Sequence, residues 1–413
     1  MAPVPQKRGA MDTLITSMLG LLLAAIAVAL VARRLHLPYT VGLVLAGAAL
    51  AMARVNTGIT LTHDIIFSLI LPPLLFEAAI NIHWRELRKD ALPVLVLSVA
   101  GTLIAATIVS AGMVWALGWP LQEAALFGAL IAATDPVAVI AMFKDNNVSG
   151  RLRLLVGAES LFNDGVAAVL FTLVLAWAQA NGGAPQSLPA MVLNLGWTVA
   201  GGVAIGLATA AIVLALVGPT SDHLVESTLT TVAAYGSFLA AQHFGCSGVL
   251  ATVTAGLVIG NLGILSEPEK SRITPYGRRF MLGLWEFIAF IADSLVFLLI
   301  GLAVGGMRLT QPTEIALLAV VALVTLSRAL TVYPLCLCFA RTRWAVPAAM
   351  QHVLWWGGLR GALGLALALS LPATLAYRND ILTATFAVVI FSVVGQGLTM
   401  PPLLRGLGFI PRR

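Results

Sequence analysis

Apolar stretches follow one another along almost the whole chain, separated by short polar, glycine-containing or proline-containing connections. A helix needs about 20 mostly apolar residues to cross the hydrocarbon core of a bilayer. Only 10% of the 413 residues are charged and 59% are hydrophobic, whereas soluble proteins carry roughly 25% charged residues. We therefore expect an all-α integral membrane protein with about 13 transmembrane helices. The expected spans are 13–32, 39–53, 62–81, 91–117, 122–143, 150–179, 191–217, 225–243, 247–262, 280–305, 312–340, 346–372 and 380–404.

The basic residues predict which side of the membrane each connection faces. Of the 24 Lys and Arg residues, 17 fall in one set of alternate connections, five in the other, and two inside spans. Because cytoplasmic connections are enriched in Lys and Arg, we expect a cytoplasmic C-terminus and an outside N-terminus. Lys7 and Arg8 oppose this trend, and they would be absent if synthesis began at Met11 rather than Met1.

The chain is interpreted as a single transmembrane domain, residues 1–413. It stops soon after the last span, so we expect no separate cytoplasmic domain at the C-terminus. The first span has no convincing cleavage motif, which favours a membrane helix over a signal peptide. The basic clusters are topology signals, which argues against nucleic acid as a partner. The cysteines and histidines lack metal-ligand spacing, so we expect no cofactor and no resident metal.

Ionisable residues inside membrane spans are functional candidates, because burying a charge in hydrocarbon is costly. The alternatives for any one of them are a structural ion pair or a side chain that reaches an interface. Seven remain inside the expected spans: Glu77, Asp135, Glu159, Asp164, Asp293, Arg328 and Arg360. The sequence assigns no role to Asp293.

Four polar residues lie close together in the sequence ESLFNDGVAAVLF of the sixth span. On a helix, Ser160 and Asp164 share one face, and Glu159 and Asn163 share the neighbouring face. The hydroxyl and carboxylate of the first face are hard oxygen ligands for a small cation. Glu159 instead needs a cationic partner, and the two arginines inside spans are the available fixed cations.

Two spans are predicted to be broken in the middle of the membrane. In LIAATDPVAVI, Pro136 cannot continue the helix and moves Asp135 away from helical geometry, which frees carbonyl groups near Thr134. In WWGGLRGALG, three glycines surround Arg360. The fifth and twelfth spans run in opposite directions, so the pattern is typical of an inverted repeat with two broken crossing helices. Asp135 could compensate the positive helix ends there and Arg360 the negative ends.

Seven motifs occur in the order found in NhaP-type sodium/proton antiporters, which are relatives of the animal sodium/proton exchangers. They are FSLILPPLLFEAAI, ATDPVAV, ESLFNDGVAAVLF, FGCSGVLATVTAGLVIGN, SLVFLLIGL, SRALTVYPL and WGGLRGALGLALALSLP. The resemblance covers essentially the whole chain. It implies a thirteen-helix fold, usually dimeric, in which a core domain moves against a dimerisation domain.

The resemblance also implies roles for individual residues. Asp164 matches the carboxylate that binds either the cation or the proton. Glu159 matches a structural glutamate whose partner best matches Arg328. Positions that line the ion site are matched by Thr134, Asp135, Ser160, Asn163 and Glu77. An Asn-Asp pair, here Asn163 and Asp164, resembles that of electroneutral exchangers.

Together these features predict a transporter that exchanges Na⁺, or Li⁺ or K⁺, for H⁺ by alternating access in the cell (inner) membrane. Its expected role is pH and sodium homeostasis, and its expected partners are the two ions, membrane lipid and a second copy in a homodimer. A K⁺/H⁺ antiporter of the same family is the alternative, and a cation channel is less favoured. A membrane hydrolase using Ser160 is disfavoured, because G-x-S-x-G and H-E-x-x-H motifs are missing. We therefore expect no enzymatic activity.

Overall fold

The computed structural model describes residues 6–35, 38–54, 61–179, 188–217, 222–266, 273–306 and 314–411. Apart from a single isolated bridge, the secondary structure within these ranges is entirely helical. The described part of the chain therefore has the all-helical architecture predicted from the sequence. Some residues that entered the topology prediction lie outside the described ranges: Met1, Lys270, Arg272, Arg308, Arg412 and Arg413.

The helices of the first half of the chain are α1 (Gln6–Leu35), α2 (Tyr39–Met52), η1 (Ile65–Ile70), α3 (Leu71–Ile80), α4 (Trp84–Leu87), α5 (Ala91–Leu95), η2 (Val96–Ala100), α6 (Gly101–Leu117), α7 (Leu121–Ile131), α8 (Val137–Asp145), α9 (Arg151–Gln179) and α10 (Leu188–Val217). The remaining helices are α11 (His223–His243), α12 (Gly248–Ile259), η3 (Gly260–Ile264), α13 (Pro275–Gly306), α14 (Glu314–Cys338), α15 (Ala348–Trp356), α16 (Ala362–Leu369), α17 (Arg378–Ile390), η4 (Phe391–Gln396) and α18 (Gly397–Gly406).

Each expected span coincides with helical structure to within a few residues, apart from the earlier start of the first. Among the described residues, six helices are long and apolar enough to cross a membrane, and five shorter helices are also apolar. The chain is thus a multi-pass membrane protein, while the total of thirteen crossings stays a prediction. The fifth and twelfth spans are each divided, into α7 with α8 and α15 with α16.

Four π-helical segments, η1 to η4, lie within or beside the apolar helices. The sequence pattern did not predict them, because a π-turn inserts one residue into an otherwise ordinary apolar helix. Such turns change which side chains face a neighbour. Two of them, η1 and η2, directly precede α3 and α6, which pack against the helices of the site.

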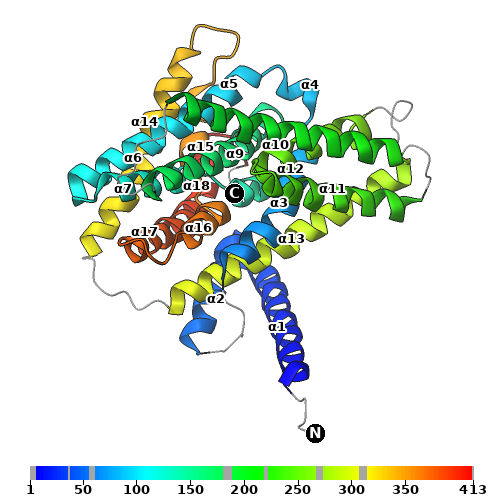
Figure 1. Ribbon diagram of the computed structural model, residues 1–413, viewed down its shortest axis with the longest axis horizontal. Helices are drawn as coiled ribbons and strands as arrows, with labels where there is room; N and C mark the ends of the chain where they lie inside the picture. Colours follow the sequence, from blue (N-terminus) through cyan, green and yellow to red (C-terminus); the bar gives the residue numbers. More distant parts are fainter. Residues whose placement is uncertain are drawn as a thin grey trace.

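Figure 1 shows the long helix α13 running beside α2, with α1 projecting away from the rest of the molecule. α13 and α2 approach so closely that a Cβ at Gly47 would lie 2.9 Å from the Leu302 nitrogen. Gly301, on α13, meets Gly47 from the other side. Small residues allow such backbone contact between membrane helices, which fixes α13 firmly against α2.

The buried apolar side chains of the described residues form one large cluster, a smaller one, and a group of three, Ala241, Cys246 and Ala251. The large cluster includes α7, α9, α16 and α17, and the smaller one joins α3 to α10, α12 and α13 around Phe76 and Trp285. Helix α9 contacts α7, α8, α15 and α16 as well as α3, α10 and α12. This central place carries the polar sequence ESLFND into the interior of the protein (Figure 1).

Candidate cation-binding site

The two interrupted spans meet at their breaks. The backbone N–H of Asp135 donates to the carbonyl oxygen of Leu359 at 2.7 Å, and these residues form an antiparallel bridge. Neither residue is helical, because Pro136 and the Gly357–Gly358 pair end the preceding half-helices. The contact therefore brings four half-helix ends, from α7, α8, α15 and α16, to one place in the interior.

The carboxylate of Asp135 lies at the N-terminal ends of two half-helices. Its Oδ1 accepts from the backbone N–H of Val137 at 3.0 Å, and the backbone N–H of Ala362 also donates to the carboxylate. Val137 begins α8 and Ala362 begins α16. A negative charge is stabilising there, because the free N–H groups of a helix start carry partial positive charge. Gly361 makes the approach possible, since any side chain there would overlap this carboxylate.

Two arginines lie at the C-terminal ends of the half-helices, where free carbonyl groups carry partial negative charge. Arg360 donates to the carbonyl oxygens of Ala132 and Ala133, at 2.8 and 3.0 Å, directly after α7. Arg328 lies within 3.4 Å of the carbonyl oxygen of Leu354, in the last turn of α15. Asp135 thus lies at the positive, N-terminal ends of two half-helices, and Arg360 lies at a negative, C-terminal end. Arg328, which the sequence did not assign to a helix end, lies at a second C-terminal end.

Glu159 and Arg328 form a bidentate ion pair. The two terminal nitrogens of Arg328 donate to the two carboxylate oxygens of Glu159 at 2.9 and 2.7 Å. The residues are only 1% and 5% exposed. Paired geometry of this kind satisfies both charges where water is excluded. Gly358 provides the space, because a Cβ at that position would lie 2.7 Å from Nε of Arg328.

Asp164 is in a different situation, although it lies on the same helix. Its Oδ1 is buried and has no hydrogen-bond partner among the described residues, while the residue as a whole remains partly exposed. One turn earlier, the hydroxyl of Ser160 lies 3.0 Å from the hydroxyl of Thr134, beside the first break. α9 therefore carries a carboxylate oxygen without a described partner one turn after a hydroxyl that contacts a second hydroxyl beside the break, and carboxylates and hydroxyls are ligands that hard cations prefer.

Asn163 and Glu77 lie at the edges of this group. The amide nitrogen of Asn163 is 3.5 Å from Oε1 of Glu159, and its own buried Oδ1 has no partner within the described ranges. Asn163 thus touches the ion pair rather than Asp164. Glu77 accepts from the side-chain amide of Asn81 at 2.9 Å and lies within electrostatic reach of Lys144. No hydrogen bond joins Glu77 to Asp164 in the described part of the chain.

Two features of the site have no signal in the sequence. Arg360 binds backbone carbonyl groups, those of Ala132 and Ala133. Because every residue has a backbone carbonyl group, the residue types do not reveal which ones an arginine will bind. Lys144, in α8, forms an ion pair with Glu286, in α13, although the two are 142 residues apart. Only the folded backbone brings such groups together.

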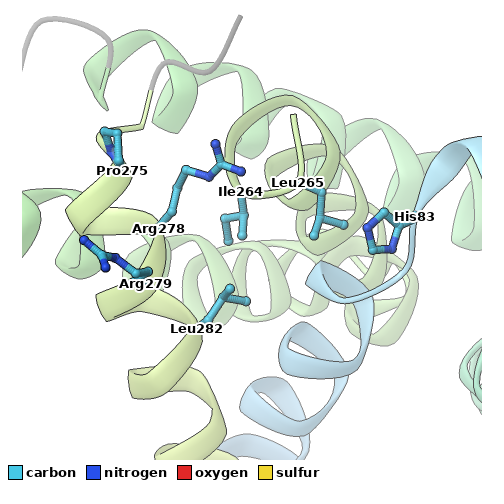
Figure 2. A pocket seen from close by; sticks show the side chains of 7 residues that line it. All are labelled: His83, Ile264, Leu265, Pro275, Arg278, Arg279 and Leu282. Atoms are coloured by element: carbon cyan, nitrogen blue, oxygen red, sulfur yellow. The ribbon is translucent and has the colours of Figure 1, made fainter. Parts of the chain in front are cut away.

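A separate cavity of about 430 Å³ lies away from these residues. Figure 2 shows its lining side chains, which come from the end of η3, the start of α13 and the turn after α3. They are His83, Ile264, Leu265, Pro275, Arg278, Arg279 and Leu282. None of them is among the residues predicted to bind ions, so this cavity is not the candidate site.

The comparison with known families decides the identity of this arrangement. Residues 21–406 match the family described as "Sodium/hydrogen exchanger, transmembrane". The chain belongs to this family. Within the sodium/hydrogen exchanger family it is of the NhaP type, which confirms the resemblance carried by the seven motifs.

Two curated relatives show how far the similarity extends. The chain is 39% identical to the Na⁺/H⁺ antiporter ApNhaP of Aphanothece halophytica over 92% of this chain and 71% of that protein. It is 36% identical to the Na⁺/H⁺ antiporter NhaP of Pseudomonas aeruginosa over 83% and 81% of the two chains. Among solved structures, the sodium proton antiporter MjNhaP1 from Methanocaldococcus jannaschii at pH 8 matches with a TM-score of 0.74 at 20% identity. That match covers 96% of this chain and all of the other, and it shows that this family member has the NhaP fold.

Proposed function

We propose that this protein exchanges Na⁺ for H⁺ across the cell membrane by alternating access, with both ions competing for Asp164. The observation that carries the proposal is that Oδ1 of Asp164 has no partner among the described residues, while Asp135, at the meeting point of the two broken helices, lies within its electrostatic reach. A buried carboxylate without a fixed cation needs a mobile one, and sodium and the proton both meet that need. The names of the similar NhaP proteins support sodium as the cation. Transport needs no covalent step, so we propose no enzymatic activity.

The test is a pH-gradient assay in proteoliposomes. Adding Na⁺ should dissipate an imposed pH gradient with the unaltered protein, whereas Asp164→Asn should abolish the response while the protein still folds. Asp380→Asn is the matched control, because Asp380 is exposed in the first turn of α17 and is not among the residues predicted to bind ions. Full exchange by Asp164→Asn would overturn the proposal.

Competition for one carboxylate also predicts how pH acts on sodium binding. Protons occupy Asp164 more often as the pH falls, so the apparent KM for Na⁺ should rise at low pH while the maximal rate changes less. Initial rates measured over a series of Na⁺ concentrations at several pH values would check this. An apparent KM that is independent of pH would argue against a shared carboxylate.

The same vesicles distinguish the rival functions. Replacing Na⁺ by Li⁺ or K⁺ identifies the cation, and a response to K⁺ alone would favour the K⁺/H⁺ antiporter. A cation gradient that carries current but moves no protons would favour a channel. We propose an electroneutral exchange, supported by the Asn163–Asp164 pair, so an imposed membrane potential should not change the rate.

We propose that the protein works as a homodimer in the inner membrane, with its N-terminus outside and its C-terminus in the cytoplasm. The distribution of Lys and Arg supports this orientation. Cysteine labelling tests the orientation, because the partly exposed residue Arg405, replaced by cysteine, should react only with reagents that reach the cytoplasm. Mass photometry in detergent or nanodiscs tests the dimer.

A further inference from the structure

Two carboxyl groups in the described part of the chain have a buried oxygen without a hydrogen-bond partner, Asp164 and Asp293. Asp164 is accounted for by the proposed exchange, whereas Asp293 has no role in it so far. Asp293 lies in the middle of α13, a helix of 32 residues that runs beside α2. A partnerless carboxyl oxygen inside a membrane protein is costly, so its retention points to a function.

The backbone of α13 around Asp293 is anchored to α2 by neighbouring residues. The hydroxyl of the next residue, Ser294, lies 2.6 Å from the hydroxyl of Tyr39 at the start of α2. The ring of Tyr39 stacks on Phe290, one turn before, with 5.4 Å between ring centroids. These contacts, together with the close backbone packing of α13 on α2, fix the backbone of α13 at Asp293.

The charged groups that act most strongly on Asp293 among the described residues are carboxyls. Its carboxyl lies within electrostatic reach of the carboxyls of Asp135 and Glu77, and Asp135 is in turn within reach of Asp164. Basic side chains do not appear among the described groups that act on Asp293. Like-charged carboxylates in a poorly solvated place cannot all stay ionised unless a cation or a proton joins them.

The protein does not fully enclose Asp293. One carboxyl oxygen is buried, but the residue as a whole is partly exposed, as Asp164 is. Asp293 is thus a partly exposed residue of α13 whose buried carboxyl oxygen has no partner among the described residues. It differs from Glu159, which is 1% exposed and fully paired.

We propose that Asp293 is a cation-coordinating residue of the transport route, which holds the monovalent cation between Glu77 and the Asp135–Asp164 site. This inference rests on the proposed function. It adds a residue of α13 to the proposed cation ligands on α9 and at the helix breaks. The geometry assigns α13 a direct contact with the transported ion, beyond its packing against α2.

The variants Asp293→Asn and Asp293→Glu test the proposal. Asparagine keeps the size of the side chain but removes the charge, and losing one charged ligand should raise the apparent KM for Na⁺ about tenfold or more. The maximal rate should fall less than the apparent affinity. Glutamate restores the charge, so Asp293→Glu should recover part of the lost affinity.

Ser294→Ala is the matched structural control. It removes the hydrogen bond to Tyr39 and so loosens the packing of α13 without touching the carboxyl. If Asp293 acts only through packing, Ser294→Ala and Asp293→Asn should alter exchange alike. An apparent KM in Asp293→Asn equal to that of the unaltered protein, or a shift reproduced by Ser294→Ala, would overturn the proposal.

A binding measurement separates this inference from the exchange function. Na⁺ should raise the Tm of the purified unaltered protein, because a ligand that binds the folded state stabilises it. In Asp293→Asn the same rise should need about tenfold more Na⁺. If the unaltered protein shows this rise but no exchange, the proposed function fails while Asp293 keeps its place as a ligand. An identical sodium dependence in both proteins contradicts the inference.

Discussion

Glu159 and Asp164 both enter the interior from α9, and their surroundings differ completely. Glu159 receives two hydrogen bonds from Arg328 and is 1% exposed, whereas an oxygen of Asp164 has no partner among the described residues. Burial alone therefore does not identify a transport residue. The presence or absence of a fixed partner distinguishes a carboxylate that holds the fold from one that can take up a mobile ion.

Glu159→Gln should produce the largest loss of stability. Arg328 would keep a buried charge without a full partner, which lowers the free energy of unfolding by about 3–5 kcal/mol. Thermal unfolding in detergent, followed by intrinsic fluorescence, measures the effect. Because Glu159→Gln combined with Arg328→Gln removes both charges, the double variant should regain part of the lost stability. Unchanged stability in Glu159→Gln would show that the ion pair is not a support of the fold.

Asp135→Ala should have the next largest effect. It removes the acceptor for the N–H groups of Val137 and Ala362, which leaves two half-helix starts without a partner. We expect a loss of about 2–3 kcal/mol in stability, together with loss of exchange. Asp135→Asn keeps an acceptor oxygen and should recover most of the stability but not the exchange. Equal stability of the Ala variant and the unaltered protein would contradict the capping role.

Gly361→Ala tests the space between the two breaks. The added methyl group would overlap the Asp135 carboxylate, so the carboxylate or the backbone must shift. Such overpacking costs about 1–3 kcal/mol, and it should reduce the exchange rate because it displaces Asp135. Gly406→Ala is the matched control, since a Cβ at Gly406 meets nothing within 4 Å. Equal exchange rates in the two variants would rule out this steric role.

Lys144→Ala should have the smallest effect on stability. The ion pair between Lys144 and Glu286 is exposed, and exposed pairs contribute about 0–1 kcal/mol. The change should therefore leave the Tm nearly unaltered, and high salt should have little further effect on it. A loss as large as that of Glu159→Gln would mean that exposure does not separate weak pairs from strong ones in this protein.

The helical fold and most of the helix limits follow from the sequence. The length of each apolar run predicts a membrane helix, and the polar, glycine or proline residues between runs indicate where it begins and ends. The break before Val137 was predictable for the same reason, since Pro136 has a local steric effect. The π-helical turns were not predictable, because one extra residue in an apolar run leaves the pattern unchanged.

The candidate site was predictable in its residue types but not in its distances. Helical spacing separates the face of Asp164 from that of Glu159, as the structure shows in their different surroundings. Contacts such as Arg360 with the carbonyl groups of Ala132 and Ala133 depend on the tertiary fold. Asp293 shows the same limit, because nothing in its neighbouring sequence reveals that Asp135 and Glu77 lie within its electrostatic reach.

Sodium-triggered proton release tests the central claim most directly. The protein is held in weakly buffered detergent solution, at a pH where exchange runs at about half its maximal rate. Adding Na⁺ should then displace the proton held by Asp164, with up to about one proton released per chain. Asp164→Asn should release none, although its Tm should equal or exceed that of the unaltered protein because it loses an unpaired buried carboxyl. Undiminished proton release by a folded Asp164→Asn variant would contradict the account.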